Sequence, residues 1–395
     1  MAVMPDAAPD PRSLYVHVPF CAHRCGYCDF VTTSRSPELH ERYVAALATE
    51  ARLRGHGERT YDTIFVGGGT PTLLEPSAMD SLLGWVEARA AAGAEVTLEC
   101  NPETVDRSLA QRIVDGGVTR VSLGAQSFAP HVLATLERRA DPDTVRRAVA
   151  TLRDAGVQHL SLDLIWGVPG QQPQDVTRDL GEALALEPDH LSAYELEFKP
   201  GTRLAHAFGT DRELAVGEAG EELYDLVVDR LEAAGWWWYE TANFARTPDD
   251  RCAHNLAYWH ADPWDAVGVG AVATAAVPDA TLVRRTTLPN VPRWLAAVEA
   301  GTVPPERVET VPAATARAER IMLGIRLDAP VRIHPADLLD EVVDAAGLER
   351  VAELGLGTVT TMPDDDGVHR GAVELRLNRR GRMLQGSVAG LLIDP

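Results

Sequence analysis

Between about residue 14 and residue 196 the chain alternates six short apolar runs with longer amphipathic stretches. The apolar runs are Leu14–Val18, Thr63–Val66, Val96–Leu98, Val118–Leu123, His159–Leu164 and His190–Tyr194. The amphipathic stretches have helical spacing and commonly end at glycine: Pro37–Arg54, Ser77–Ala92, Arg107–Asp115, Asp143–Ala155 and Pro173–Leu186. Repeated strand–helix units predict parallel strands with crossover helices. In such folds the chemistry gathers on loops at the carboxyl ends of the strands.

Three cysteines follow the first apolar run with the spacing C-x3-C-x2-C. They are Cys21, Cys25 and Cys28. A four-iron cluster normally takes four thiolates, one for each iron. Because no further cysteine occurs before Cys100, such a cluster here has one iron free to bind a small molecule. The sequence therefore indicates a [4Fe-4S] site with an open iron.

Structural zinc is the alternative for this loop. Zinc needs a closed tetrahedral set, and His17 or His23 could complete it. Zinc ligands usually come as two short pairs, whereas this is a single triplet. The spacing favours the cluster.

Polar and glycine-rich segments follow the other apolar runs. Gly67-Gly68-Gly69-Thr70 comes after the second run, and consecutive glycines let a ligand approach the backbone closely. Glu99, Gln126 and Asp163 stand at or near the ends of the next runs. Carboxylates and amides at these repeated positions are hard to explain by packing, so they indicate a binding site.

Composition narrows the possible partners and the compartment. With 37 basic and 58 acidic residues the net charge is −21, which disfavours nucleic acid and anionic membranes as partners. No apolar run reaches the length of a membrane span, and Met1–Arg12 does not have the pattern of a secretory signal. An exposed cluster needs a reducing compartment. We therefore expect a cytoplasmic protein without stable membrane insertion.

The cysteine spacing is the hallmark of radical S-adenosylmethionine (SAM) proteins, and the chain resembles that superfamily. Over nearly its whole length it looks like the subgroup that contains the oxygen-independent coproporphyrinogen III oxidases and the HemW-type heme chaperones. The resemblance implies an α/β fold, an incomplete (β/α)6 barrel, with the cluster on the three cysteines and SAM chelating the open iron. The positions that match SAM contacts of the subgroup are Tyr15, Gly68, Gly69, Thr70, Glu99, Gln126, Arg138 and Asp163.

Three features favour the chaperones within this subgroup. Phe30 stands two residues after the third cysteine, where the oxidases generally have a fourth cysteine, and the segment before the first strand is short. The element His254-Asn255-Leu256-Ala257-Tyr258-Trp259 resembles the H-N-x-x-Y-W signature of the chaperones, which makes His254 the candidate heme contact. The alternative is a hydrogen-bonded histidine that orders its own loop. Cys252 is read as a small buried residue rather than a second ligand.

Three positions depart from the family pattern. Ala140 and Val272 stand where the family usually has histidines, and Thr287 replaces a customary asparagine. None of them carries the expected cluster or main SAM contacts, but the two missing imidazoles bear on heme handling.

The resemblance implies a heme chaperone that binds heme and passes it to acceptors such as respiratory hemoproteins. The rival is an enzyme that decarboxylates coproporphyrinogen III, and anaerobic product analysis would distinguish the two; Phe30 predicts no product. A tetrapyrrole methyltransferase or a heme-degrading enzyme is the third class considered. The sequence does not indicate the oligomeric state or whether SAM is cleaved.

The sequence divides into four parts: a disordered tail (1–12), the radical SAM core (13–235), a family-specific segment (236–300) and a C-terminal domain (301–395). Trp236-Trp237-Trp238 is read as a strand entering the core. The C-terminal part shows helical patterns, two alternating strands and the acidic turn Asp364-Asp365-Asp366, which together predict a winged-helix-like module. Because the chain is acidic, we expect this module to cover the barrel or to bind a partner rather than DNA. The elements expected here are Ala313–Leu327, His334–Ala345, Leu348–Leu354, Thr358–Met362, Val373–Leu377 and Met383–Leu392.

Overall fold

The computed structural model describes residues 10–34, 36–209, 219–277, 281–362 and 371–393. Residues 1–9 of the expected tail and the acidic turn Asp364–Asp366 lie outside these ranges. The disorder expected for residues 1–9 and the turn expected at residues 364–366 are therefore not tested by the structure.

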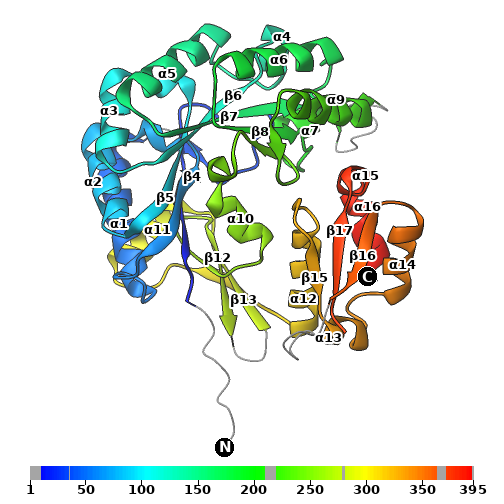
Figure 1. Ribbon diagram of the computed structural model, residues 1–395. Coiled ribbons are helices and arrows are strands. Elements are labelled where there is room, and N and C mark those ends of the chain that lie inside the picture. Colours follow the sequence, from blue (N-terminus) through cyan, green and yellow to red (C-terminus); the bar gives the residue numbers. More distant parts are fainter. Residues whose placement is uncertain (1–9, 35, 210–218, 278–280, 363–370, 394–395) are drawn as a thin grey trace, which may run out of the picture.

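Six parallel strands form the centre of one large sheet in the order β1-β4-β5-β6-β7-β8, which confirms the predicted α/β core (Figure 1). These strands are β1 (Ser13–Val18), β4 (Tyr61–Gly68), β5 (Ala90–Cys100), β6 (Arg120–Gln126), β7 (His159–Trp166) and β8 (His190–Glu195). The helices between them are α1 (Pro37–Leu53), α2 (Pro76–Glu87), α3 (Arg107–Asp115), α4 (Pro130–Thr135), α5 (Pro142–Ala155) and α6 (Pro173–Ala185). They cover the outer face of the curved sheet.

Local signals set several helix ends. The carboxylates of Asp106 and Asp141 accept the N–H groups of Leu109 and Thr144, so they cap α3 and α5. One predicted end was wrong: the helix expected to reach Ala92 ends at Glu87. Main-chain pairing with β4 overrides the helix preference of alanine, because residue 90 is already aligned with Tyr61.

The sheet continues past both edges of the parallel core. On the β8 side it adds antiparallel strands β10 (Asn243–Ala245) and β9 (Trp237–Trp238). On the β1 side it adds the parallel strand β11 (Trp264–Val267) and then antiparallel β12 (Val272–Val277), β13 (Thr281–Thr287) and β14 (Glu306–Val311). Within the described residues β14 and β9 are the two ends of the sheet, so the barrel is incomplete, as predicted.

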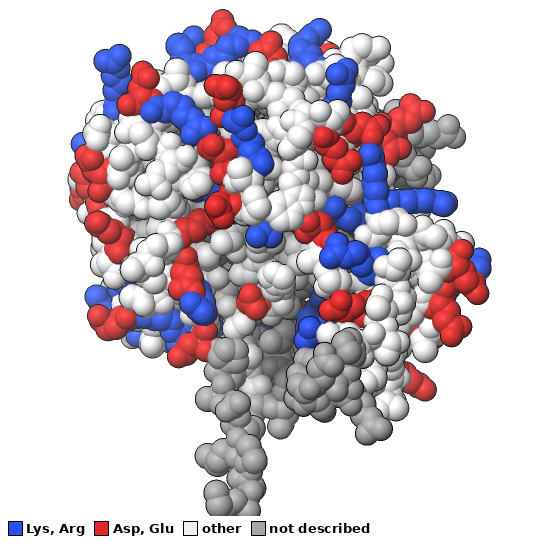
Figure 2. Space-filling view, in the orientation of Figure 1, with Lys and Arg blue, Asp and Glu red and all other residues white. Residues whose placement is uncertain are grey.

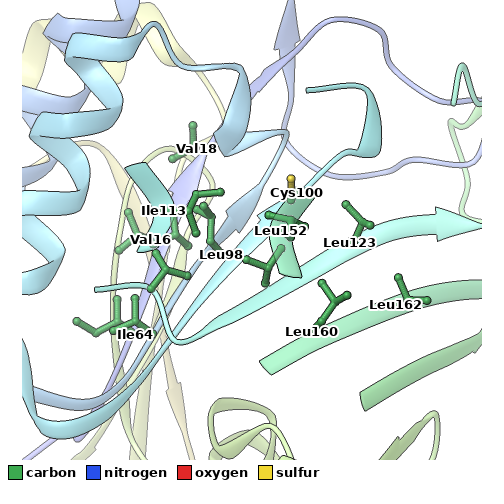
Figure 3. Close-up of a cluster of buried hydrophobic side chains, with 14 of the residues drawn as sticks. Val16, Val18, Ile64, Leu98, Cys100, Ile113, Leu123, Leu152, Leu160 and Leu162 are labelled. Atoms are coloured by element: carbon green, nitrogen blue, oxygen red, sulfur yellow. The ribbon is translucent and has the colours of Figure 1, made fainter. Parts of the chain in front are cut away.

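Alternation along the strands separates an apolar exterior from a polar interior. Val16, Leu98, Leu123 and Leu162 face the helices and pack in the main core (Figure 3). The residues between them face inward and are largely polar, as at Glu99 on β5. The packed outer layer therefore leaves a polar interior for ligands.

The short helix α10 (Ala253–Trp259) carries the H-N-x-x-Y-W element and packs on β4. Its first main-chain N–H groups, those of Ala253 and His254, each donate to the carboxylate of Glu95 at 3.0 Å. Thr63 and Glu95, which hold it, are aligned across β4 and β5, several residues before the carboxyl ends of these strands. Helix α10 therefore closes the end of the barrel opposite the cysteine loop.

The tryptophan run enters the core as a short strand, as predicted. Trp236 and Trp238 are buried, and the ring of Trp238 stacks on Phe244. The guanidinium of Arg382 lies over Trp238, 3.7 Å from the ring centroid. Trp238 thus joins the barrel to the C-terminal part of the chain.

The C-terminal residues form a second apolar core around Ile321, Ile333, Val351 and Leu375. The element order is helix, strand, two helices and a hairpin, the winged-helix-like arrangement that the sequence predicts. The elements are α12 (Ala313–Gly324), β15 (Val331–Ile333), α13 (Pro335–Leu339), α14 (Ala345–Glu353), β16 (Gly357–Thr361), β17 (Val373–Leu377), α15 (Arg379–Met383) and α16 (Gln385–Leu392).

Two boundaries in this part differ from expectation. The single helix predicted for His334–Ala345 is only the short α13, because Glu341 adopts a left-handed backbone (φ 56°) that ends it. The boundary drawn at residue 301 falls before β14, which pairs with β13 of the large sheet.

The surface carries mixed charge. Lys and Arg side chains are interspersed with Asp and Glu over the face shown in Figure 2, and pairs such as Arg146–Glu182 (2.7 Å) are common. Exposed pairs of this kind contribute at most about 1 kcal/mol each. Searched over the described residues, the helices include none whose length and hydropathy suit a membrane crossing.

Candidate functional site

A cavity of about 590 Å³ opens at the carboxyl ends of the parallel strands and extends into the barrel. All three cysteines of the C-x3-C-x2-C motif line it, together with most of the residues that the resemblance assigned to SAM. These residues are Gly68, Gly69, Thr70, Glu99, Gln126, Arg138 and Asp163. The strand ends bring together positions up to about 140 residues apart in the sequence.

The cysteine loop is anchored from both sides. The N–H of Gly26 donates to the carbonyl of Leu136 (3.3 Å), and the carbonyl of Gly26 accepts the N–H of Leu204 (2.9 Å). The short strands β2 (Phe20–Cys21) and β3 (Thr33–Ser34) pair in parallel and fix the two ends of the loop. The loop therefore presents its thiols to the cavity from a fixed backbone.

The donor set fits a [4Fe-4S] cluster. All three thiols are free and partly buried, and burial raises the pKa of Cys21 to about 11. Within the described part of the chain, no three His, Cys, Asp or Glu side chains converge on one point as ligands of a single ion. Three free thiols on one loop match a cluster that takes one thiolate on each of three irons and leaves the fourth iron open.

The glycine segment lies against the cysteine loop. The N–H of Gly69 donates to the carbonyl of Val18, and the N–H of Thr70 donates to the carbonyl of Phe20, both at 2.8 Å. Gly68 has a positive φ of 111°, which a side chain rarely adopts. Its N–H donates to a carboxylate oxygen of Glu99 at 2.9 Å. The bare backbone forms part of the cavity wall.

A chain of polar contacts links Arg138 to two of the cysteines. One guanidinium nitrogen lies 3.6 Å from the Cys25 sulfur, and the other donates to the side-chain oxygen of Asn101 at 3.0 Å. Asn101 donates to the hydroxyl of Thr70 (3.0 Å), and that hydroxyl lies 3.8 Å from the Cys21 sulfur. The Nε of Arg138 is buried without a protein partner. This network places a cation and a hydroxyl beside the thiols, and both groups favour the charged thiolate form.

Asp163 and Gln126 complete the far wall. Burial raises the pKa of Asp163, although hydrogen bonds from Ser122 and Ser192 favour its charged form. Gln126 adopts a left-handed backbone (φ 67°) at the end of β6. Such strain in a non-glycine residue gathers at ligand sites.

Tyr15 is the one expected SAM contact that does not line the cavity. Its hydroxyl lies 3.1 Å from Nδ1 of His17, and the other nitrogen of His17 donates to the carbonyl of Val31 at 2.8 Å. In this arrangement Tyr15 supports the segment that leaves the cysteine loop, and a direct contact with SAM stays a prediction.

His254 lies at the opposite end of the barrel, buried at 1% exposure. Its Nδ1 contacts the hydroxyl of Thr63 (2.9 Å) and its Nε2 that of Tyr258 (2.8 Å). Burial lowers its pKa to about 3, so the imidazole is neutral. Both ring nitrogens of His254 already have partners. The geometry therefore favours the structural alternative, in which His254 orders its own segment and does not bind heme. Cys252 is also buried, and its thiol donates to a carboxylate oxygen of Glu95 at 3.5 Å.

The positions that depart from the family pattern are structural here. Ala140 is buried, and Thr287 accepts a hydrogen bond from Arg54 at 3.2 Å. Val272 begins β12, where its carbonyl accepts the indole N–H of Trp264 at 2.6 Å.

Asn101, Ser122 and Ser192 are site residues that the sequence reasoning did not assign. Ser122 and Gly124 lie two residues apart on β6 and share its inward face. Ser192 of β8 is aligned with Asp163 of β7. Applying the period-two alternation within the predicted strands would have found both serines. Asn101 needed its contacts with Arg138 and Thr70, which sequence does not provide.

Burial raises the pKa of Glu99 from 4.5 to about 7. The folded protein therefore holds this proton after the unfolded chain has released it. We expect the free energy of unfolding of the ligand-free protein to fall as pH rises from 4.5 to 7, by at most about 3 kcal/mol from this group. Glu99→Gln removes this contribution, so the variant should gain stability relative to the parent across that window in urea unfolding. Parallel pH profiles for the two proteins would contradict the assignment.

Three cysteines and a glycine segment at the open end of an incomplete barrel define a radical SAM protein, and the Radical SAM superfamily model matches residues 15–182. Over 337 residues (82% of this chain and 84% of the relative) the chain is 38% identical to the heme chaperone HemW of Mycobacterium tuberculosis. It is 38% identical over 288 residues to the heme chaperone HemW of Escherichia coli, covering 70% of this chain and 73% of that protein. The chain belongs to the HemW heme-chaperone family.

The fold is shared with a solved structure as well. Coproporphyrinogen III oxidase (HemN) from Escherichia coli matches with a TM-score of 0.75 over 99% of this chain and 91% of that one. The sequence identity is 20%, so the likeness concerns the fold alone.

Proposed function

We propose that this protein is a heme chaperone that holds a [4Fe-4S] cluster on Cys21, Cys25 and Cys28, binds SAM beside it, and delivers heme to acceptor hemoproteins. The observation that carries the proposal is the identity of 38% to HemW heme chaperones over most of the chain. The cavity supports the cofactor half, because it joins the three thiols to the residues expected to contact SAM. Phe30, which lines the same cavity and is 58% exposed, stands in place of the fourth cysteine of the oxidases.

The side chains in the cavity suit the parts of SAM. A bound [4Fe-4S] cluster would supply one iron without a protein ligand. Arg138 offers a half-buried cation for a carboxylate. Glu99 and Asp163 offer carboxylates to cationic or hydroxyl groups, and a cation beside Glu99 would favour its charged form. The glycine backbone allows close approach of the ligand.

A hemin titration of the reconstituted, anaerobic protein tests the chaperone proposal. We expect saturation near one heme per chain, with a Soret band that reports ligation. His254→Ala tests the candidate heme contact, and Tyr258→Phe is its matched control. The control removes the hydroxyl that contacts Nε2 but keeps the imidazole. If His254 binds heme after α10 moves, His254→Ala should lose the ligated spectrum and Tyr258→Phe should keep or strengthen it.

Two outcomes would contradict these assignments. Equal binding by the parent and both variants, with one Soret spectrum, would restrict His254 to its structural role and place the heme elsewhere. No saturable hemin binding by the parent protein would overturn the chaperone proposal itself.

A further inference from the structure

The inner half of the cavity is polar and is not accounted for by the cluster and SAM positions. It continues past Glu99 and Asp163 to helix α10, where Cys252 and Asn255 form its floor. Thr97 lies one inward position before Glu99 on β5, about 7 Å deeper. Thr97 is aligned with Arg120 of β6, and both side chains line the cavity.

Both of these side chains have a buried polar atom without a protein partner. Thr97 is 1% exposed and its hydroxyl is unpartnered, and Arg120 is 2% exposed with an unpartnered Nη1. Buried polar atoms are nearly always hydrogen-bonded. Two such atoms at aligned positions on one cavity wall therefore indicate a missing acceptor.

The remaining contacts of Arg120 show why its Nη1 is available. Its Nε donates to Glu95 at 3.2 Å, and its Nη2 donates to the carbonyl of Arg251 at 3.0 Å. Glu95 cannot turn to satisfy Nη1, because its carboxylate also accepts the N–H groups of Ala253 and His254 at 3.0 Å. The contacts of Glu95 with α10 therefore leave Nη1 of Arg120 without an acceptor.

A guanidinium nitrogen beside a hydroxyl is a pair of donors, and a carboxylate is the acceptor that suits it. One oxygen can accept from both groups in a charge-assisted hydrogen bond, which is strong in a buried site. The imidazole of His190 does not compete for the two donors, because both of its ring nitrogens already have partners, Ser161 and Tyr239, each at 2.8 Å. The partner missing from this site is therefore a hydrogen-bond acceptor.

We propose that the inner half of the cavity is a carboxylate-binding site formed by Arg120 and Thr97. The carboxylate belongs either to a small organic acid or to the acidic arm of a larger ligand that enters from the cysteine end. The second source rests on the proposed heme function, since heme carries propionate arms; the first does not. The two sources share one recognition chemistry and differ in size.

Binding of sodium propionate to the full-length, ligand-free protein tests the site, with neutral propionamide as a probe of the same shape. We expect saturable calorimetric binding of propionate at one site per chain, and at least about tenfold weaker binding of propionamide. Thr97→Val should weaken propionate about tenfold. This variant removes only an unpartnered hydroxyl, so it should fold. Arg120→Gln should abolish binding, and Thr151→Val, on the outer surface of α5, should change nothing.

A second arm identifies the source of the carboxylate. If the acid is an arm of heme, propionate should compete with hemin, and hemin dimethyl ester should bind more weakly than hemin to the parent, with a smaller difference between the two in Thr97→Val. If the ligand is a free acid, esterification of hemin and the Thr97→Val substitution should both leave hemin binding unchanged, and propionate should still bind the parent protein. No saturable propionate binding together with no effect of Thr97→Val on hemin would overturn the site. Failure of hemin binding alone would leave the propionate result to decide, so the two proposals fail separately.

Discussion

Replacing Cys21, Cys25 or Cys28 by alanine should remove most of the iron and sulfide that the parent protein takes up on anaerobic reconstitution. Each substitution leaves two thiolates for a cluster that already has one iron without a protein ligand. No other thiolate can take over, because no other cysteine lies on the loop. Iron and sulfide analysis, with the visible absorption of the cluster, measures the loss.

Cys100→Ala is the matched control. Cys100 lines the cavity through its place at the end of β5, but its side chain belongs to the helix-facing core with Leu98 and Leu123 (Figure 3). Burial raises the pKa of its thiol to about 12, and the thiol donates to the carbonyl of Asn101 at 3.6 Å. The variant should keep its iron. If Cys100→Ala lost the cluster and one of the loop variants kept it, the three-thiol site would be wrong.

The parallel core could be predicted because two independent signals agree there. Apolar alternation located the strands, and the polar residue that follows each strand marked the cavity end. The same logic placed Glu99 and Asp163 correctly, since their position depends only on their own strands. Arg138 follows α4 rather than a strand, and it was assigned by the family resemblance alone.

The sequence was less informative wherever a long-range contact decides the outcome. Alanine at residue 90 extends the pattern of a helix, but pairing with β4 makes it strand. Glu341 interrupts a helical pattern through a left-handed backbone that its residue type does not announce. His254 has the sequence context of a ligand, whereas Thr63, 191 residues earlier, occupies one of its nitrogens. A motif specifies which residues occur together, and the fold determines which atoms remain free.

Gly69→Ala should separate the glycine segment from the cysteine loop. A Cβ at this position would lie 2.7 Å from the carbonyl oxygen of Phe20 and from the carbonyl carbon of Pro19. Both are backbone atoms of the segment leading to Cys21, and the N–H of Gly69 is hydrogen-bonded to the same segment at Val18. A rotamer change cannot relieve the contact, so the two segments must move apart at a cost of about 1 to 3 kcal/mol.

This movement disturbs both halves of the site, since the glycine segment lines the expected SAM position and the other segment carries Cys21. We expect at least about tenfold weaker SAM binding by the reconstituted protein, together with a lower melting temperature. Gly84→Ala is the control. Gly84 lies within α2 with open space around its Cβ, so alanine should raise helix stability by up to about 1 kcal/mol and leave SAM binding unchanged. Unchanged SAM affinity and melting temperature in Gly69→Ala would mean that the glycine and cysteine segments do not pack as closely as the structure places them, and the cavity would then need another explanation for its polar wall.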